Sequence, residues 1–327
     1  MAVTTTTTTT MKRRAKVLAK EDELKLIRDD DYRGDTDRRK GKVVWFPNVL
    51  WYLGLHVLAF LGLYMLLAKA MWKTWAFCYL MYLMNALGIT AGAHRLWSHR
   101  TYSATLPYRV MLMLFNCISM QNDVIEWSRD HRGHHKWSET DADPYNYNRG
   151  LFFCHVGWLM TKKRPEVIEK GRTLDLADLY ADPVLRFQKK FYMPLALFCN
   201  FALPTLVPVL AWGEGFWTAY LTAGVFRYVC CLHITWCINS VAHWRGHRPY
   251  DRRIKPAENW LTSVASIGEG WHNFHHTFPH DYKAAEMPYL LNFTTAFIDF
   301  FSLFGWTYRR KVVSSQLVQK MRQTHGE

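Results

Sequence analysis

The sequence predicts an all-α integral membrane protein, with four transmembrane helices in two hairpins and a helical cytosolic cap that holds a dinuclear metal site. Two observations predict this fold class: four long apolar runs that are nearly free of charge, and a set of histidines at the ends of those runs and between them. Half of the 327 residues are hydrophobic. The mean hydropathy is only -0.17, because polar stretches separate the apolar runs.

The apolar runs have the length of membrane spans. A helix needs about 20 apolar residues to cross a bilayer. The runs that meet this condition cover residues 47–68, 74–93, 191–212 and 216–242. Lys69 and Lys73 lie in the short link of the first pair, and Gly213-Glu214-Gly215 forms a tight turn in the second. Each pair is therefore predicted to form a helical hairpin.

One cation, Arg227, interrupts the fourth run. A charge in contact with lipid is costly, so this side chain should face the bundle interior or extend toward an interface. Both a functional role and a structural role, such as an ion pair, fit the position.

The distribution of Lys and Arg predicts the orientation in the membrane. Cations gather in the N-terminal segment, in residues 94–190 and near the C-terminus, and the short turns hold few. The positive-inside rule then places both termini in the cytosol.

The predicted domain covers residues 44–312, with a cap from 94–190 and 243–312. Residues 1–43 are expected to be disordered, because a Thr tract and mixed charges offer little to bury, and 313–327 form a tail.

Two weaker apolar stretches, residues 106–125 and 288–306, contain polar side chains. We expect amphipathic helices at the membrane interface there.

The composition also excludes some classes of protein. The net charge is +14, but the basic N-terminal segment is mixed with acidic residues and contains no common nucleic-acid-binding motif, so no nucleic-acid partner is expected. The seven cysteines form no C-x-x-C pair. They are expected to be packing residues in a reducing compartment.

Nine of the fifteen histidines form a pattern. These are His94 and His99 in HRLWSH, His131, His134 and His135 in HRGHH, His243 in NSVAH, and His272, His275 and His276 in HNFHH. Residues three and four apart share one face of a helix, so each H-x-x-H-H triplet can direct three imidazoles into a common space. Asn239 and His243 share a face for the same reason. His94 and His99 are five apart, and we expect the chain to unwind between them.

The number and type of these ligands predict a metal centre. Imidazole binds Zn, Cu, Fe and Ni, and nine imidazoles exceed the need of one ion and suit two. A structural zinc site would be closed by four ligands, so a dinuclear site indicates redox chemistry. The other six histidines are expected to have structural roles: His56, His155, His233, His247, His280 and His325.

The motifs resemble the three histidine boxes of the stearoyl-CoA desaturase family, including its insect members. The resemblance covers roughly residues 44–312 and is carried by residues 94–102, 130–144, 239–243, 248–251, 268–276 and 292–295. It implies four transmembrane helices under a cytosolic cap and two iron ions. One iron would be bound by His94, His99, His131, His135 and His275. The other would be bound by His134, His243, His272 and His276, with Asn239 completing the set.

The resemblance also implies a reaction. It implies that a saturated fatty acyl-CoA loses two hydrogens and gains a cis double bond at the Δ9 position, with O2 as co-substrate. Electrons would come from cytochrome b5 and its NADH-dependent reductase, at the endoplasmic reticulum membrane. An unactivated C–H bond gives an acid or base no point of attack, so a cofactor must supply the oxidant. Nearby acids are candidates to orient the imidazoles through the second ring nitrogen: Glu139, Asp141, Asp143 and Glu269.

Substrate contacts can be matched in the same way. The family's positions for substrate binding correspond to Asn48, Asn122, Arg129, Asp130, Lys162, Lys163 and Trp236. Relatives often carry Arg-Lys at the two lysines, and lysine keeps the charge but lacks the planar fork of arginine. Tyr82 and Ala86, one turn apart on the second span, would line the closed end of the acyl tunnel. The small side chain of Ala86 leaves room for a longer chain.

Two alternatives remain open. Another di-iron membrane enzyme, either a desaturase of different regiochemistry or a fatty acyl hydroxylase, could use the same site, and only its products would distinguish it. The non-enzyme alternative is a metal transporter or an inactive scaffold. A transporter would place its ligands near the membrane midplane, whereas these histidines lie at the ends of spans and between them.

Overall fold

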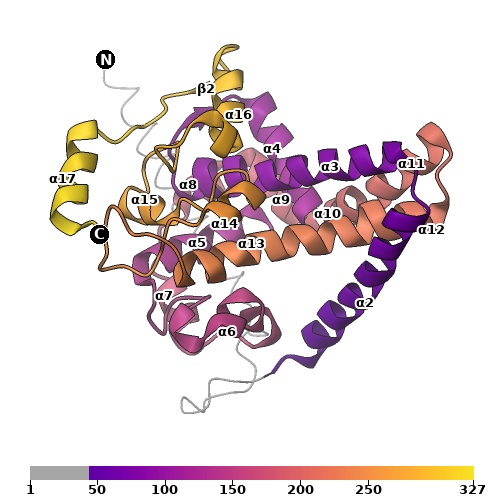
Figure 1. Cartoon of the computed structure of the whole chain (residues 1–327), viewed down its shortest axis with the longest axis horizontal. Helices are drawn as coiled ribbons and strands as arrows, with labels where there is room; N and C mark the ends of the chain where they lie inside the picture. The colour runs from indigo at the N-terminus through magenta and orange to yellow at the C-terminus, as the bar shows by residue number, and fades with distance from the viewer. Residues whose placement is uncertain (1–43) are drawn as a thin grey trace, which may run out of the picture.

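Four long apolar helices confirm the predicted all-α membrane fold (Figure 1). In this computed structural model, which describes residues 44–327, they cover Phe46–Ala68, Trp72–Ser98, Tyr192–Trp212 and Phe216–Trp244. They are 21 to 29 residues long, sufficient to cross a bilayer. The prediction of disorder for residues 1–43 lies outside the described residues.

Three of the four long helices change type along their length. The first is α2 (Phe46–Ala68), and the second joins α3 (Trp72–Leu87) to the π-helix η2 (Gly88–Ser98). The third joins α10 (Tyr192–Leu197), the π-helix η5 (Phe198–Ala202) and α11 (Leu203–Trp212). The fourth joins α12 (Phe216–Ala219), the π-helix η6 (Tyr220–Phe226) and α13 (Arg227–Trp244).

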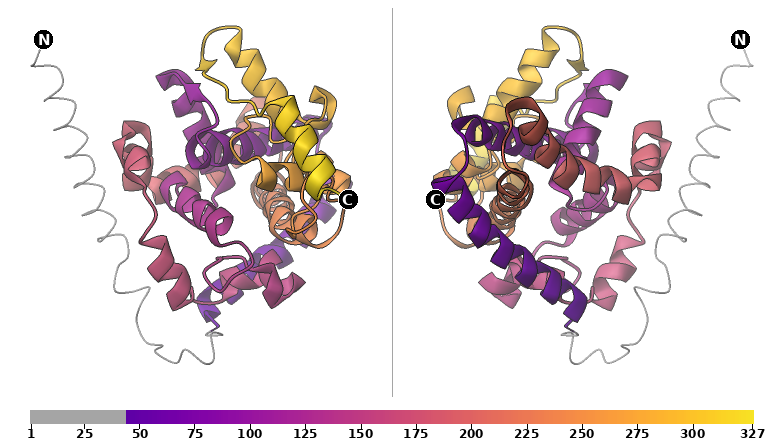
Figure 2. Two further views of the ribbon diagram at one scale, coloured as in Figure 1. Left: turned by 90° about the vertical axis from the view of Figure 1, so that its left-hand side faces the viewer. Right: turned by 90° about the vertical axis from the view of Figure 1, so that its right-hand side faces the viewer.

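Short helices build the cap at one end of the long helices (Figure 2). Between the second and third long helices lie α4 (Leu106–Ser119), α5 (Val124–Trp137), η3 (Tyr147–Arg149), α6 (Leu151–His155), η4 (Gly157–Met160), α7 (Pro165–Gly171), α8 (Ala177–Ala181) and α9 (Pro183–Lys190). After the fourth come α14 (Trp260–Ala265), α15 (His272–Thr277), η7 (Tyr289–Leu291), α16 (Phe293–Ser302) and α17 (Ser315–His325). Two short strands, β1 (Ser103–Ala104) and β2 (Thr307–Tyr308), pair antiparallel.

A buried carboxylate joins the two hairpin turns at the end remote from the cap. Glu214 is 5% exposed, and its Oε2 accepts hydrogen bonds from the backbone N–H of Met71 at 2.9 Å and from Thr74 Oγ at 2.6 Å. Its Oε1 accepts from the N–H of Gly215 at 3.1 Å. Free N–H groups at the first turns of α3 and α12 favour an anion there. The predicted tight turn therefore also fixes the two hairpins to each other.

Arg227 has a structural environment. Its guanidinium donates to the carbonyl of Ala223 at 2.9 Å and to the carbonyl and side-chain oxygens of Asn200 at 2.9 and 2.7 Å. It forms no ion pair with an acidic residue in the described part of the chain. The π-helices η5 and η6 leave carbonyls that an α-helix would have satisfied, and a buried cation supplies the missing donors. Of the two roles left open for Arg227, these contacts favour the structural one.

The two weaker apolar stretches form α4 and α16, and neither is long enough to be among the four candidate spans. In α4, Tyr108 and Leu112 are fully buried, while Leu106 and Leu114 are 54% and 40% exposed. The exposed face of α4 is thus apolar, whereas its polar side chains Asn116 and Ser119 are buried, so the predicted amphipathic pattern with a polar outer face is wrong for α4. Their location at a membrane interface stays a prediction.

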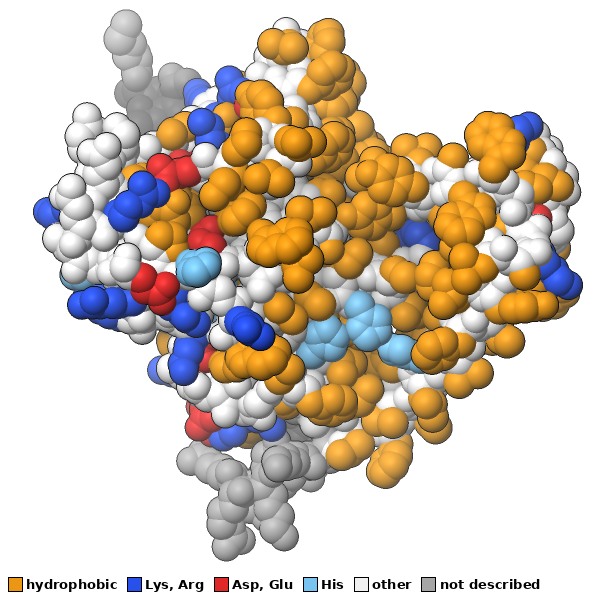
Figure 3. Space-filling view, in the orientation of Figure 1, with side chains coloured by type: hydrophobic (Ala, Val, Ile, Leu, Met, Phe, Trp, Pro, Cys, Tyr) orange, Lys and Arg blue, Asp and Glu red, His pale blue; other side chains and the backbone are white. Residues whose placement is uncertain are grey.

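The outer surface divides into an apolar and a charged part. Hydrophobic side chains cover the long helices, and Lys, Arg, Asp and Glu gather over the cap around α15 and α17 (Figure 3). Phe60 and Leu210, for example, are 73% and 80% exposed. Side chains of this kind are stable only against lipid or a partner, so the surface supports a membrane position for the long helices.

The predicted tail contains a docked helix. Val318 of α17 is 3% exposed and packs in one cluster with Tyr250, Phe274 and Phe278. Because Phe274 belongs to α15, α17 supports the helix that carries the third histidine box.

Candidate metal centre and substrate cavity

His94 lies in η2, at the cap end of the second long helix, and His99 is the residue that ends η2. The N–H of His99 donates to the carbonyl of His94 at 3.1 Å, which is the i to i+5 hydrogen bond of a π-helix. Residues five apart therefore share a face here. The predicted unwinding between these histidines is wrong: the helix continues and widens, because the π-helical repeat matches the spacing of the two ligands.

The second box lies on α5. Its first turn is capped by Asp123, whose Oδ1 accepts from the N–H groups of Ile125 and Glu126 at 3.0 and 3.1 Å. The ring of His131 stacks on Trp127 with centroids 4.9 Å apart. The α-helical repeat turns His131 and His135 toward one space and His134 toward another, so this triplet divides between two groups.

The third box lies on α15, a helix of six residues that is too short to be stable alone. Asn273, which is fully buried, accepts from the N–H groups of Tyr250 and Asp251 and donates to the carbonyls of Asp251 and Pro256. Before the helix, a Cβ on Gly270 would lie 2.2 Å from the nitrogen of Ser263, so only glycine fits. Backbone contacts therefore fix the direction of the histidines.

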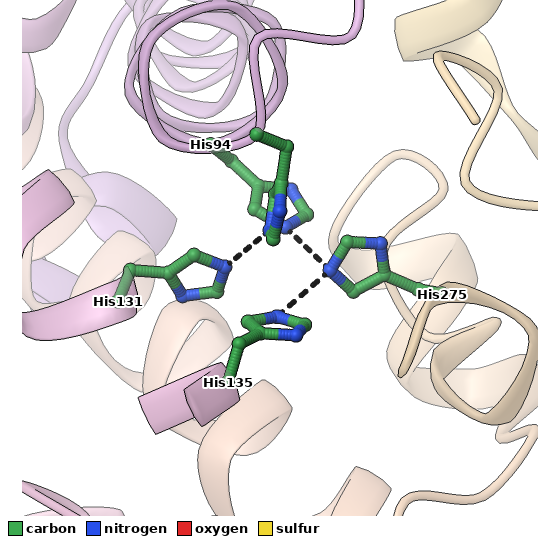
Figure 4. A group of neighbouring side chains, drawn as sticks. His94, His131, His135 and His275 are labelled. Atoms are coloured by element: carbon green, nitrogen blue, oxygen red, sulfur yellow. Dashed lines mark hydrogen bonds between the residues drawn. The ribbon is translucent and has the colours of Figure 1, made fainter. Parts of the chain in front are cut away.

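The nine histidines form two compact groups. The five-histidine group is His94, His99, His131, His135 and His275, and the four-histidine group is His134, His243, His272 and His276. Within each group the possible ligand atoms all lie within 4.8 Å of one another. The membership equals the two ligand sets that the resemblance implies. Figure 4 shows His94, His131, His135 and His275 pointing toward one centre from different segments.

Distances within the groups fit metal ions. In the five-histidine group, Nε2 of His275 lies 2.9 Å from Nε2 of His94 and 3.0 Å from Nε2 of His135. In the four-histidine group, Nε2 of His272 lies 3.1 Å from the same atom of His243 and of His276. Two nitrogens at about 2.1 Å from one ion and at right angles to each other would be about 3.0 Å apart. The spacing therefore matches neighbouring ligands of a shared ion.

Three carboxylates fix the tautomers of three histidines. Glu269 lies 2.8 Å from Nδ1 of His94, Asp143 lies 3.0 Å from Nδ1 of His134, and Glu139 lies 2.9 Å from Nδ1 of His243. Each Nδ1–H donates to its carboxylate, so the lone pair of Nε2 points into the group. The prediction is wrong for Asp141, which is 62% exposed and pairs with Arg164. Proximity in sequence placed Asp141 near the ligands, but its side chain points to solvent.

Burial keeps the remaining imidazoles neutral. It is the main cause that lowers the pKa of six histidines well below the usual value, and neighbouring histidines add to it: His99, His131, His135, His272, His275 and His276. Burial alone would raise the pKa of Glu269, but Arg95 and His94 lower it to about 2. Neutral imidazoles beside ionised carboxylates form a site for cations. The identity of the nine histidines and Asn239 as ligands stays a prediction.

A cavity of about 80 Å³ begins beside the five-histidine group. His131 and Asn239 line it together with three of the predicted substrate contacts, Asn122, Asp130 and Trp236. A second cavity of about 20 Å³ is lined by the predicted tunnel-end residues Tyr82 and Ala86. Thr235 lines both. The two cavities are therefore neighbours on either side of Thr235, and the larger one touches the five-histidine group at His131.

The other predicted substrate contacts lie outside these two cavities. Arg129, Asp130 and Lys163 line a surface hollow of about 30 Å³. Lys163 Nζ lies 2.9 Å from Asp130 and 3.2 Å from Glu126, an acid that the sequence analysis missed. Asn48 donates to the carbonyl of Leu159 at 2.8 Å. Lys162 lies 5.3 Å above the ring of Trp45. Neither Asn48 nor Lys162 lines the two cavities.

Comparison with known proteins decides the family. The family model for fatty acid desaturases matches residues 70–290. The Delta(9)-fatty-acid desaturase fat-6 of Caenorhabditis elegans is 51% identical over 287 residues, 88% of this chain and 84% of the relative. This chain belongs to the fatty acid desaturase family. Stearoyl-CoA desaturase 5 of Bos taurus is 50% identical over 285 residues, 87% of this chain and 84% of the relative. An acyl-CoA Delta(11) desaturase of Spodoptera littoralis is 46% identical over 291 residues, 89% of this chain and 86% of the relative.

Arg95 of this desaturase is a site residue that sequence reasoning missed. It is 1% exposed, lies next to His94, and donates from Nε to Glu269 at 2.9 Å. It also donates to Asn292 at 3.2 Å and to Thr295 at 2.9 Å, which belong to the Asn-Phe-Thr-Thr motif noted in the sequence. The Asn-Phe-Thr-Thr motif could have indicated Arg95, because buried polar side chains such as Asn292 and Thr295 need a hydrogen-bond partner.

Three of the desaturase's other histidines form a chain of their own. Nε2 of His233 lies 2.9 Å from Nε2 of His56, and Nδ1 of His233 lies 3.0 Å from Nε2 of His155. His155 continues to Ser240 Oγ at 2.9 Å. The rings surround Trp236, whose centroid lies 5.1 Å from that of His233. The chain connects α2, α6 and α13 behind the cavity wall, in agreement with the structural role predicted.

Proposed function

We propose that this chain is an acyl-CoA Δ9 desaturase that inserts a cis double bond into a saturated fatty acyl-CoA. The observation that carries the proposal is the pair of buried histidine groups beside one cavity, with a second cavity, lined by Tyr82 and Ala86, next to it. The names of the relatives support the substrate and the position of the bond. In the overall reaction, the acyl chain, O2, two electrons and two protons give an alkene and two molecules of water.

The residues of the chain have separate parts in this reaction. Two iron ions bound by the histidine groups would supply the oxidant that breaks the C–H bonds. Glu139, Asp143 and Glu269 hold ligand imidazoles in the tautomer that presents Nε2. Trp236, which is 2% exposed, forms part of the cavity wall and holds the acyl chain away from water. The cations Arg129 and Lys163, at the surface hollow, suit the phosphates of coenzyme A.

The cellular setting is part of the proposal. The charged cap faces the cytosol, both termini lie on that side, and the long helices cross the endoplasmic reticulum membrane. Cytochrome b5 and its reductase would deliver the two electrons at the cap. The concentration of Lys and Arg on the cap side of the molecule supports this orientation.

A Δ11 desaturase is the second candidate, because relatives of that name are 46% and 47% identical to this chain. The metal centre is the same for both reactions. The distance from the histidine groups to the closed end of the cavity would decide which carbon reacts.

Expression in a desaturase-deficient host cell tests the function. The cells receive saturated fatty acids of several lengths, and mass spectrometry locates any double bond in their lipids. We expect Δ9 alkenes from the intact chain and none from His135→Ala, whose membrane insertion is checked by fractionation. Alcohols would indicate a hydroxylase, Δ11 alkenes the second candidate, and unchanged lipids would contradict the proposal.

A further inference from the structure

The five-histidine group has one carboxylate behind it, and a cation neutralises that carboxylate. Glu269 bonds His94 on one side and Arg95 on the other, where Nε and Nη2 of Arg95 lie 2.9 and 2.8 Å from Oε1. The side chains of Arg95 and Glu269 are 1% and 3% exposed. Water therefore screens this pair little, and its two charges cancel beside the group.

The four-histidine group has two carboxylates and no cation. Asp143 bonds His134, and Glu139 bonds His243. Asp143 also accepts from the backbone N–H groups of Glu139 and Tyr145, at 2.9 and 3.0 Å. Within residues 44–327, neither acid forms an ion pair with a lysine or arginine. Backbone donors stabilise the carboxylates without cancelling their charge.

The backbone of Glu139 is held in an unusual conformation. Its φ is 64°, in the left-handed region that non-glycine residues avoid. Its N–H bonds Asp143, and its carbonyl accepts from Asn148 at 2.8 Å, so neighbours on both sides fix this conformation. Its Oε1 bonds His243, while its Oε2 is buried without a hydrogen-bond partner. Strain of this kind persists where the surroundings impose it, often at functional sites.

We infer that the two metal positions are electrostatically unequal, and that the iron in the four-histidine group is the one that becomes ferric first. Imidazoles are neutral ligands, so the nearby carboxylates set the net charge at each position. Two uncompensated anions favour a 3+ ion over a 2+ ion more strongly than one anion paired with Arg95 does. A carboxylate on Nδ1–H also makes its imidazole a stronger donor. Arg95 is thus a positioning residue that keeps the five-histidine position the harder one to oxidise.

The inference rests on the two iron ions of the proposed function, and a redox titration tests it. The full-length protein in detergent is loaded with 57Fe, and iron content is measured first. Ferricyanide then removes one electron from the diferrous pair, which leaves one ferric and one ferrous ion. A second electron is removed in a separate step. Mössbauer and EPR spectra follow the two steps. We expect two resolved potentials for the wild-type protein.

Charge variants assign the steps. Glu139→Gln keeps an oxygen for His243 but removes the anion, so it should raise the potential of the first step. Arg95→Gln leaves the charge of Glu269 without its cation and should lower the potential of the second step. Both variants should therefore narrow the difference between the two potentials. Glu269→Gln leaves Arg95 unpaired and should widen it. Arg109→Gln, which removes a half-buried cation paired with Asp182 instead of with a carboxylate of the histidine groups, is the matched control and should change neither potential.

The outcomes separate this inference from the proposed function. A protein that cannot hold two iron ions would contradict both. A protein that holds two and desaturates, but in which Glu139→Gln moves the second potential or neither, overturns the inference alone. If Arg95→Gln does not fold, the other two variants still decide, because Glu139→Gln should narrow the separation of the two potentials and Glu269→Gln should widen it.

Discussion

Single side chains decide much of the chemistry at the end of the acyl path. Tyr82 and Ala86 line the smaller cavity, and Ala86 has the smaller side chain of the two. A methylene group added or removed in an apolar pocket changes selectivity by about 10- to 200-fold. If this cavity holds the end of the acyl chain, as predicted from the sequence, the length of substrate that fits depends on the volume at Ala86.

Replacing Ala86 by Trp should shift the preference toward acyl chains that are shorter by two or more carbons. The indole would fill the closed end, so the ratio of C16 to C18 products should rise about tenfold or more. Mass spectrometry of products from mixed substrates measures the ratio. Leu80→Trp, on the same helix at a position that is 50% exposed, is the control and should leave it unchanged. An unaltered product profile for Ala86→Trp would contradict the assignment of the tunnel end.

Glu258 predicts a dependence of stability on pH. Burial is the main cause that raises the pKa of this carboxyl to about 7, while its Oε1 accepts from the N–H of Phe274 at 2.7 Å. Between the unfolded pKa of 4.5 and about 7, the folded chain binds the proton more tightly, so stability falls as pH rises.

The matching variant is Glu258→Gln, which is neutral at every pH and keeps the acceptor. The wild-type free energy of unfolding should fall by up to about 3 kcal/mol between about pH 5 and pH 7.5 because of Glu258. In Glu258→Gln this contribution is absent, so the melting temperature should decline less over the same range. Melting curves across this range measure it. Glu169→Gln changes an exposed acid on α7 and should follow the wild-type curve. An identical slope for Glu258→Gln would show that Glu258 does not titrate in this window.

At the scale of elements, the helix type determines which histidines meet. The α-helical repeat brings His131 and His135 of α5 into one group, but His134, which was predicted to share their space, lies in the other group. The α-helical repeat failed for His94 and His99, because a π-helix has a different repeat and depends on tertiary contacts that no local pattern shows. The same reason explains why the surroundings of Arg227 could not be predicted: its acceptors are carbonyls freed by two other π-helices.

The histidine chain through His233 gives a prediction for α2. Replacing His233 by Phe keeps an aromatic ring against Trp236 but leaves Nε2 of His56 and of His155 without partners. Unpaired polar groups inside apolar surroundings cost about 1–3 kcal/mol. The melting temperature in detergent should therefore fall by several degrees. His247→Phe, at an exposed position in the cap, should not change it. Equal stability of the two variants would mean that the chain does not support α2.

For the whole molecule, charge and hydropathy predicted the architecture, and tertiary contacts supplied the rest. The spans were predictable because lipid excludes charge, so their limits appear as charge-free runs. The candidate ligands were predictable because nine histidines in repeated motifs are rare. Asp141 was misassigned and Arg95 missed, since sequence distance does not give the direction of a side chain. The docking of α17 could not be predicted, because Val318 is the one fully buried residue of a polar helix and Arg322 finds its partners Tyr250 and Glu286 only in the folded chain.

The predicted orientation can be tested on the intact fold. Lys73→Cys lies in the turn at the remote end, and Lys320→Cys lies on α17 in the cap. In sealed microsomes, a membrane-impermeant maleimide should label Lys320→Cys directly and Lys73→Cys only after the membrane is opened. The native cysteines are buried or half-buried and give the background. Direct labelling of Lys73→Cys would reverse the assignment of the cytosolic side.

The contact between the two hairpin turns has a consequence for synthesis. Glu214 follows its partner Met71 by 143 residues. At about 5–20 residues per second, a ribosome needs roughly 7–30 s to produce that length. During this time the first hairpin lacks the carboxylate of Glu214 that fixes its turn. His94 and His99, at the end of that hairpin, lack the partners that come later in the chain. Residues 272–276 emerge later still. Under the proposed function, both metal positions need histidines from residues 272–276, so iron would load only after all four long helices have been synthesised.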